Sequence, residues 1–510
     1  MESATLTRPR PVAAPESSAR EERRTGRWPW IAFALLCAGA IWGFFAFPTY
    51  PNYDSYYSLL WGRELLDGTL PSYDAYRAPT PHPLAIALGT VLSLLGHGAE
   101  RIWILLCVAS FVALVAGVYK LGREAFTPLV GLIAAILVLS RLDFPFYAAR
   151  GYIDIAYMAL VVWAAVLEAR RPRRGTSVLL MLAVAGMLRP EAWLISGLYF
   201  LWVAWPADWG TRVKFAALAA LGPLVWAGSD LIVTGDPAWS LTYTSAFAEE
   251  LGRNKSASGL LPSIWEFLVK LDKVQVLVGG IVGLCLAVSL VPRRSAVPGA
   301  LLGIGVGTFL LVGLGGFSVI DRYLLVASMV VIVFCGVALG GWTMLREGTR
   351  ARRVWAIAAA LVAATGATIT AIALDPDRLR RELTFRADAH PALHEVLEHP
   401  RVAEALKCGP ISVPNHKLIP DVRWILDLPD GAVVARSSAL RREGTPSQLR
   451  AARRLRGRIE RGGVAIYPNT RSAVLRQALV EPSDNPFTLL PLPGYQRVAV
   501  SDYYSAYVRC

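Results

Sequence analysis

Long apolar segments recur along most of this chain, and they strongly limit how it can fold. Runs of about 18 or more apolar residues, enough to cross a bilayer as a helix, recur from Trp28 to about Ala373. Charged residues make up only 18% of the 510 residues, against roughly 25% in soluble proteins. The sequence therefore predicts a polytopic α-helical membrane protein.

The basic residues between the apolar runs predict the orientation of the chain. The apolar segment 81–97 is short for a helix that crosses the membrane. If it lies on the membrane surface, each basic loop falls on the cytoplasmic side, from KLGRE (120–124) to REGTRARR (346–353). If it crosses the bilayer, the arginine-rich run at 168–175 falls outside, which the positive-inside rule disfavours.

We therefore predict a cytoplasmic N-terminus and eleven spans in the plasma membrane. The predicted spans are approximately 28–47, 101–119, 127–141, 155–168, 176–189, 192–206, 215–233, 274–292, 299–317, 324–345 and 354–373. The predicted external loops are 48–100, 142–154 and 236–273. The first loop is expected to hold surface helices near 55–67 and 81–97.

Composition divides the chain into three parts. Residues 1–27 are polar and predict a disordered cytoplasmic tail. Residues 28–374 form the predicted transmembrane domain. Residues 375–510 contain no apolar span and alternate helical with strand-like patterns, which predicts an extracytoplasmic α/β domain. In an oxidising compartment Cys408 and Cys510 could pair.

The net charge of +14 raises the question of an anionic partner. Much of the excess lies in short loops between spans, where membrane orientation accounts for it, so we predict no nucleic-acid partner. The predicted helix 447–461 places Arg450, Arg454, Arg458 and Arg461 along one face. A solvated face is the expected role, and contact with an anionic polymer or headgroup is the alternative.

Residues that could take part in catalysis or binding lie at the external ends of the predicted spans. Asp54 follows the first span and precedes a helical pattern, so it could cap that helix. It could equally serve as a general base for an acceptor hydroxyl, in a position where the helix N-terminus stabilises its carboxylate. Arg77 and His82, in the same loop, could contact a phosphate or could be ordinary surface residues.

Arg150 and Asp154 are four residues apart at the mouth of a span, the spacing of an ion pair on a helix. A carboxylate at the edge of the hydrocarbon could instead hold a metal ion or a substrate group. Arg189 and Glu191 flank Pro190 at the outer end of the fifth predicted span, where the proline would aim both side chains outward. Arg189 could bind two phosphate oxygens or merely anchor the end of the span.

Asp321, Arg322 and Tyr323 lie between two apolar runs. An arginine so close to hydrocarbon needs a partner, which Asp321 or a lipid phosphate could supply. The sequence contains no phosphate-binding loop, dinucleotide motif, zinc-ligand pair or Ser-His-Asp set.

In order and spacing, residues 28–330 resemble GT-C type glycosyltransferases, close to family 39 and the aminoarabinose-transferase-like group. The matching features are, in chain order, a span, Asp54 in NYDSYYSLLWGRELLDGTLP, the proline-led helix HPLAIALGTVLSLLG, the turn KLGREAF, Arg150 with Asp154, Arg189–Pro190 and Arg322–Tyr323–Leu324. Many relatives have a second acidic residue where this chain has Ser55, which weakens a metal site at Asp54.

The resemblance implies an enzyme that transfers a sugar, with inversion, from a polyprenyl-phosphate donor to a cell-envelope glycan, lipid or protein on the external face. Asp54 would be the base, and Asp154 would hold the acceptor, the base or a divalent metal ion. The implied substrate-binding residues are Arg77, His82, Arg150, Arg189, Glu191, Arg322 and Tyr323. The sugar stays open, with arabinose and mannose as candidates. The alternatives are a transporter or flippase of a lipid-linked sugar and a non-catalytic scaffold that displays the C-terminal domain.

Overall fold

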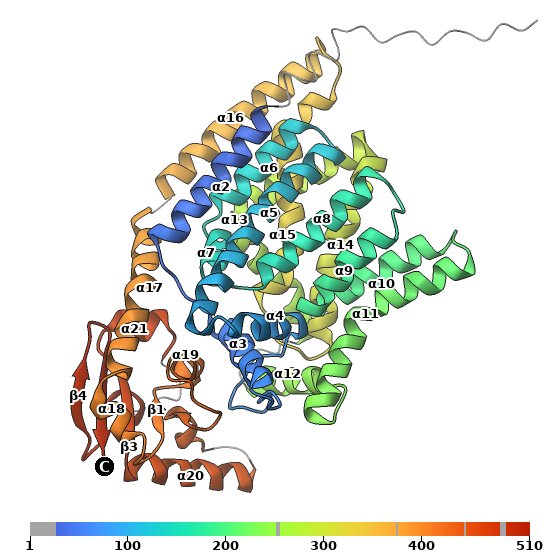
Figure 1. Cartoon of the computed structure of the whole chain (residues 1–510). Helices are drawn as coiled ribbons and strands as arrows, with labels where there is room; N and C mark the ends of the chain where they lie inside the picture. The colour runs from blue at the N-terminus through green and yellow to red at the C-terminus, as the bar shows by residue number, and fades with distance from the viewer. Residues whose placement is uncertain (1–26, 251–255, 374–375, 443–444, 480–485) are drawn as a thin grey trace, which may run out of the picture.

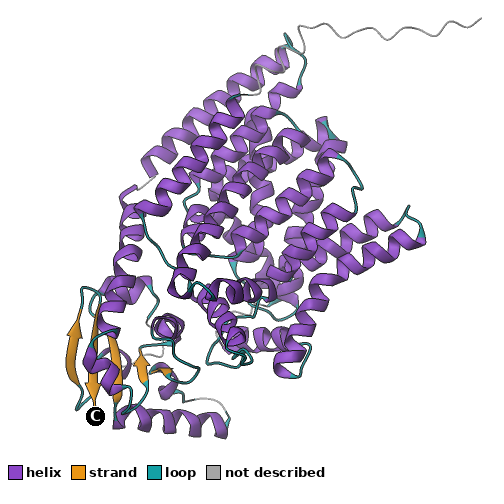
Figure 2. Ribbon diagram, viewed as in Figure 1, coloured by secondary structure: helices purple, strands orange, loops and turns teal. Residues whose placement is uncertain are grey.

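The chain folds into a large helical bundle joined to a smaller part that contains a β-sheet (Figure 1, Figure 2). The computed structural model describes residues 27–250, 256–373, 376–442, 445–479 and 486–510. The predicted tail 1–27 therefore lies, except for Arg27, outside the described residues. All strands of the described chain belong to the smaller part.

Each of the eleven predicted spans overlaps a helix of the bundle. These helices are α2 (Trp28–Ala46), α5 (Ala99–Ala125), α6 (Pro128–Ser140), α8 (Asp154–Arg170), α9 (Thr176–Leu188), α10 (Glu191–Ala204), α11 (Trp209–Thr234), α13 (Ala257–Leu290), α14 (Pro292–Leu314), α15 (Leu325–Gly340) and α16 (Arg350–Ala373). Within the described residues, seven helical segments are long and apolar enough to cross a bilayer, or up to eight if α6 and its bent continuation α7 (Asp143–Ala149) form one span. This supports a multi-pass membrane protein, while the count of eleven spans stays a prediction.

Burial separates the centre of the bundle from its lipid-facing edge. In the apolar stretch of Asp321–Met344, which contains α15, 89% of the residues are buried, whereas none are buried in that of α2 and only 6% in that of Arg350–Ile372. The exposed side chains of α2 and α16 include large apolar residues such as Trp42 and Leu361. Such surfaces are stable only against lipid or a partner, because water does not solvate them favourably.

The first external loop is built around two short helices that contact through their backbones. The helix α3 (Tyr53–Leu66) packs on α4 (Pro83–Ser93), which lies across the lower end of the bundle in Figure 1. A Cβ atom on Gly62 would lie 2.3 Å from the backbone carbon of Gly89, and one on Gly89 would lie 2.2 Å from the Ser58 oxygen. Both positions therefore require glycine, and α3 and α4 form one rigid unit.

Two of the predicted external loops are largely helical. The stretch 142–154 contains α7, and 236–273 contains α12 (Trp239–Glu250) and the start of α13, which is interrupted at Lys273 with φ of 66°. The predicted span 274–292 begins directly after this interruption, and residues 257–272 form the helical stretch before it.

The C-terminal part contains a mixed sheet of order β2-β1-β3-β5-β4. The strands are β1 (Ile411–Val413), β2 (Val433–Ala435), β3 (Gly463–Pro468), β4 (Gln496–Val500) and β5 (Tyr504–Arg509). β1 pairs in parallel with β2 and β3, whereas β5 runs antiparallel to β3 and β4. The helices are α17 (Pro376–Leu397), α18 (Pro400–Ala405), α19 (Ile419–Ile425), α20 (Pro446–Arg461), α21 (Arg471–Arg476) and α22 (Pro486–Leu489).

Charged residues join this C-terminal part to α3. Arg423 binds Glu64 through Nη2 and Oε1 at 2.7 Å and also pairs with Asp430. Arg63 forms an ion pair with Asp427 and donates to the Arg423 carbonyl oxygen at 3.0 Å. Because Arg423 is 1% exposed, these contacts are internal bonds between the two parts of the molecule.

A second set of contacts fixes the end of the first span. Arg386 donates to the Tyr50 carbonyl oxygen at 2.6 Å and stacks over the Tyr50 ring at 3.9 Å. The His390 ring stacks on the Tyr50 ring, with 4.6 Å between the ring centres. Its Nε2 lies 2.9 Å from Glu100 Oε2. The C-terminal part therefore packs directly against the loop that carries Asp54.

Cys408 and Cys510 form a disulfide between the segment after α18 and the end of the chain. We expect the double variant Cys408→Ser/Cys510→Ser to lose about 2–5 kcal/mol of stability in the C-terminal part, because the bond closes a loop of about a hundred residues. Denaturant-dependent proteolysis of this part in the intact protein would measure the loss. Cys285→Ser, at an exposed unpaired cysteine, should leave stability unchanged; an equal loss there would contradict the prediction.

Candidate active site

Asp54 lies in the first turn of α3 but does not cap it. Asn52 is the cap: its Oδ1 accepts from the backbone N–H groups of Asp54 at 2.8 Å and Ser55 at 3.4 Å. The capping interpretation of Asp54 is therefore wrong. Its carboxylate instead faces Arg322, with Oδ2 3.3 Å from Nη1.

Asp154 begins α8 and pairs with arginines far away in the sequence. Arg150 ends α7, and Gly151, with φ of 71°, turns the chain between the two residues, so they do not share a helix. The expected pair between Arg150 and Asp154 is not among the ion pairs of the described residues. Asp154 binds Arg189 at 2.5 Å through Oδ1 and lies 3.6 Å from Arg322 through Oδ2.

Arg150 has a different place in the structure. Its carbonyl oxygen accepts hydrogen bonds from the Asn52 backbone N–H at 2.8 Å and the Asn52 side chain at 3.1 Å. Its guanidinium lies 5.4 Å from the centre of the Tyr152 ring. Arg150 thus helps to position the start of α3 through its backbone.

Arg189 occupies the break between α9 and α10, where Pro190 ends the helical path. Its Nε and Nη2 atoms donate to Glu191 Oε1 at 2.9 and 2.5 Å, and its guanidinium lies 5.4 Å from the Tyr323 ring centre. The side chains of Arg189 and Glu191 are only 7% and 6% exposed. The prediction that Pro190 would aim them outward is wrong, because both point into the bundle.

Arg322 lies in the short 3-10 helix η2 (Asp321–Leu324) and connects two carboxylates. The sequence suggested that Asp321 pairs with Arg322. Asp321 instead binds Lys270, with its Oδ2 2.6 Å from Lys270 Nζ. Arg322 instead reaches Asp54 and Asp154, and its guanidinium lies 5.4 Å from the Tyr152 ring centre. The 3-10 turn thus directs Arg322 toward the site and Asp321 away from it.

These contacts make a chain of alternating charges in the order Asp54, Arg322, Asp154, Arg189 and Glu191. Its outer end is accessible, since the side chains of Asp54 and Arg322 are 28% and 25% exposed, whereas that of Asp154 is 1% exposed. Asp154 Oδ2 and Glu191 Oε2 are buried without a hydrogen bond to the described residues. Asp54 and Arg322 are therefore partly exposed to solvent, whereas the inner three residues are enclosed and hold them in place.

The two other residues predicted in the first loop have weaker links to this chain of charges. His82 precedes α4 with its ring 5.5 Å from that of Trp226. Burial and the charge of Arg189 lower the pKa of His82 to about 4, although Asp54 acts to raise it. His82 is therefore neutral near pH 7 and can offer a hydrogen bond but no positive charge. The Arg77 guanidinium lies beside the Tyr76 ring, 5.5 Å from its centre.

Lys417, from the C-terminal part, reaches the same region and was not predicted from the sequence. It lies in η4 (His416–Leu418), and its Nζ is 4.6 Å from the centre of the ring of Tyr53, the neighbour of Asp54. Burial acts to raise the pKa of Asp54, but the nearby charges of Arg322 and Lys417 outweigh it and leave the pKa below its usual value. No local sequence signal links Lys417 to Asp54, because only the packing of the two parts brings them together.

The charge of Lys417 gives a testable pH dependence. A base must be unprotonated, so activity that depends on Asp54 is lost as the pH falls through its pKa, and a lowered pKa preserves activity further into acid. We expect Lys417→Gln to raise that pKa and move the acidic limb of the pH profile of kcat/KM to higher pH. Lys407→Gln, at an exposed lysine of the same part, should leave the limb in place. If the unmodified protein and both variants have the same acidic limb in the pH profile, Lys417 does not influence the pKa of Asp54.

The residues present do not fit a resident metal ion. Asp54 and Asp154, the two predicted ligands, both approach Arg322, so a guanidinium occupies the position between their carboxylates. Within the described residues there is no group of three or more His, Cys, Asp or Glu side chains that could hold a metal. We therefore derive no step through a metal ion.

Comparison with solved structures identifies the fold. Over 94% of its length the chain matches ArnT from Cupriavidus metallidurans in the apo state, with a TM-score of 0.54, 13% identity and 98% of that chain covered. It also matches the Archaeoglobus fulgidus oligosaccharyltransferase in the apo form, with a TM-score of 0.52 and 12% identity over 92% of this chain and 73% of that one. The same enzyme tethered to an acceptor peptide gives a TM-score of 0.50 and 11% identity over 95% of this chain and 74% of that one.

No family model and no curated protein sequence matches the chain. At 11–13% identity the structural likeness establishes the fold alone. The GT-C fold implied by the sequence resemblance is confirmed.

Proposed function

We propose that this protein is an integral-membrane glycosyltransferase that moves a sugar from a polyprenyl-phosphate donor to an acceptor on the external side of the membrane. The observation that carries the proposal is the accessible pair Asp54–Arg322 at the outer end of a buried network of charges. The fold shared with ArnT and with oligosaccharyltransferase supports it. In the same proposal the N-terminus is cytoplasmic and the C-terminal part extracytoplasmic, as the basic loops favour.

The proposed reaction is a displacement at the anomeric carbon. The bond from this carbon to the donor phosphate breaks, its electron pair leaves with the phosphate, and the transition state has oxocarbenium character. The acceptor oxygen forms the new bond from the opposite face, and its proton passes to the Asp54 carboxylate. The sugar is transferred with inversion, and Arg322 stabilises the charge that develops on the leaving phosphate.

The pairing of Asp54 with Arg322 suggests how donor binding activates the base. Because Arg322 helps to lower the pKa of Asp54, the free site holds a weak base. A phosphate that attracts Arg322 would remove part of this effect and make Asp54 more basic. Asp154, Arg189 and Glu191 act as positioning residues in this proposal, because they are too buried to approach a lipid headgroup directly.

A purified-protein assay with a radiolabelled polyprenyl-phosphate sugar would test the proposal. A glycosyltransferase moves the label from the lipid to an added acceptor or to water. A transporter reconstituted into vesicles moves the intact labelled lipid between leaflets, and a scaffold does neither. Label that crosses the bilayer without cleavage of the sugar–phosphate bond would overturn the proposal.

A further inference from the structure

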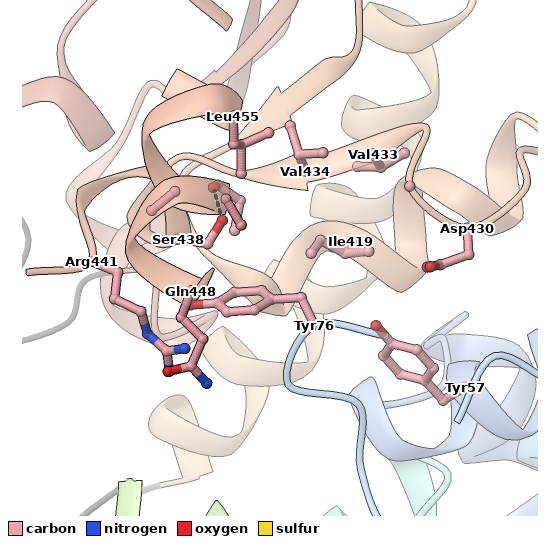
Figure 3. Close-up of a pocket in the computed structure, with 14 residues that line it drawn as sticks. Tyr57, Tyr76, Ile419, Asp430, Val433, Val434, Ser438, Arg441, Gln448 and Leu455 are labelled. Atoms are coloured by element: carbon pink, nitrogen blue, oxygen red, sulfur yellow. Dashed lines mark hydrogen bonds between the residues drawn. The ribbon is translucent and has the colours of Figure 1, made fainter. Parts of the chain in front are cut away.

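A cavity lies between the first external loop and the C-terminal part. It has a volume of about 330 Å³ and is lined by Tyr57 of α3, Tyr76, and residues of β2 and α20 (Figure 3). Figure 3 shows Arg441 and Gln448 at one end, Tyr57 and Asp430 at the other, and the Tyr76 ring between them. This volume suits one or two sugar units and lies at the small end of ligand pockets.

The lining combines aromatic and planar polar groups. Rings such as those of Tyr57 and Tyr76 offer apolar faces, whereas carboxylate, amide and guanidinium groups bind hydroxyls and anions. Gln448 Oε1 already accepts the Thr445 backbone N–H at 2.9 Å, which leaves its NH₂ group to donate to a ligand. The Tyr57 side chain is fully buried and interacts with the Tyr53 side chain through its hydroxyl, so it closes one end of the cavity.

One wall of the cavity comes from α3, the helix that carries the proposed base. The Tyr57 ring packs edge-on against the Tyr53 ring at 5.1 Å, and Tyr53 precedes Asp54. The Tyr53 hydroxyl donates to the Arg77 carbonyl oxygen at 2.6 Å, which holds the turn next to Tyr76. A chain of sugars bound in the cavity would thus end near the carboxylate that must deprotonate it.

The surroundings of the cavity favour a negatively charged ligand. The helix α20 supplies one wall through Gln448 and Leu455. Its exposed face carries six arginines, Arg450, Arg453, Arg454, Arg456, Arg458 and Arg461. Within this helix the single acidic residue, Glu460, pairs with Arg456. The positive potential of this face would attract an anionic polymer and guide it toward the cavity.

We propose that this cavity binds an anionic saccharide portion of the acceptor, an inference that rests on the proposed function. Arg441 would bind a carboxylate or phosphate of the sugar, Tyr76 would pack against a sugar ring, and Gln448 would bond a sugar hydroxyl. The acceptor is accordingly a charged glycan of the cell envelope. Its terminal hydroxyl would extend past Tyr57 toward Asp54.

Binding measured without donor lipid tests this assignment. The probes are tetragalacturonic acid and its methyl ester, in which a methyl group on each carboxyl removes the charge, titrated into the full-length protein in lipid nanodiscs. We expect the acid to bind at least about tenfold more tightly than the ester, because hydrogen bonds to a charged group are stronger than those to a neutral one. Added salt should weaken binding of the acid and leave that of the ester unchanged. Equal affinities, or no binding of either probe, would overturn the proposal.

Three variants locate the binding site. Arg441→Gln should weaken binding of the acid by about tenfold and reduce its preference over the ester. Tyr76→Leu should weaken both probes equally, because it removes the aromatic face that packs against the sugar ring. Arg497→Gln, on β4 at the opposite edge of the sheet, should bind like the unmodified protein. Loss of binding in Arg497→Gln as large as in Arg441→Gln would show nonspecific attraction and overturn the site.

This experiment separates the two proposals. Because no donor lipid is present, its failure leaves the role of Asp54 untouched. Conversely, a protein that binds the acid probe but moves no label from a polyprenyl-phosphate sugar would overturn the proposed enzyme. With an active enzyme, Arg441→Gln should raise KM for a charged acceptor without changing KM for the donor.

Discussion

Replacing Asp54 by Asn should lower the rate of sugar transfer by about 10²–10⁴-fold, the range contributed by a positioned general base. The amide has nearly the same shape but cannot take the proton of the acceptor hydroxyl. The N-terminus of α3 should stay intact, because Asn52 caps it. The measurement is transfer of label from a radiolabelled polyprenyl-phosphate sugar by purified protein.

A neighbouring carboxylate provides the control for this experiment. Asp67 ends the same helix on its exposed side. Asp67→Asn changes the net charge by the same amount and should retain normal activity. If Asp54→Asn keeps its turnover, Asp54 is not the base; if both variants lose activity equally, the effect is one of overall charge.

Replacing Arg189 by Met should destabilise the protein by about 3–5 kcal/mol, the cost of breaking a buried ion pair on one side. Arg189 is the shared partner of Asp154 and Glu191, both of which are almost fully buried. Without it, two carboxylates would face each other in a poorly solvated site. Denaturant unfolding in detergent or nanodiscs would measure the loss.

Neutralising the carboxylates tests this explanation. The triple variant Asp154→Asn/Arg189→Met/Glu191→Gln removes the uncompensated charge and should recover much of the stability lost by Arg189→Met. Arg322→Met should cost less stability than Arg189→Met, because Arg322 is partly solvated and lies at the outer end of the network. A triple variant as unstable as Arg189→Met would show that packing, and not charge, explains the loss.

Much of the helical framework could be predicted, since apolar length alone identifies membrane helices. The predicted span 274–292 begins at the break in α13 at Lys273, where Lys270, Asp272 and Lys273 interrupt the apolar run. A short, continuous apolar run indicated the strand β3. Hydropathy could not reveal that Asp321–Met344 forms the buried centre while α2 lies at the edge, because both segments are apolar.

The sequence identified most members of the charge network but paired them wrongly. Local spacing suggested Arg150 with Asp154 and Asp321 with Arg322, yet turns at Gly151 and in η2 separate both pairs. The contact between Asp54 and Arg322 joins residues 268 positions apart. Such contacts depend on how the helices pack, and no periodicity in one sequence encodes that arrangement.

The bonds of Arg423 with Glu64 and of Arg386 with Tyr50 have a consequence for anyone recombining this protein with its structural relatives. The C-terminal part cannot be grafted by cutting at its sequence boundary, since Glu64 and Tyr50 would then meet unrelated surfaces. The natural cassette for a chimera comprises two discontinuous pieces, residues 50–100 and 376–510. A functional hybrid made by exchanging both pieces together would mark them as a single module for acceptor choice.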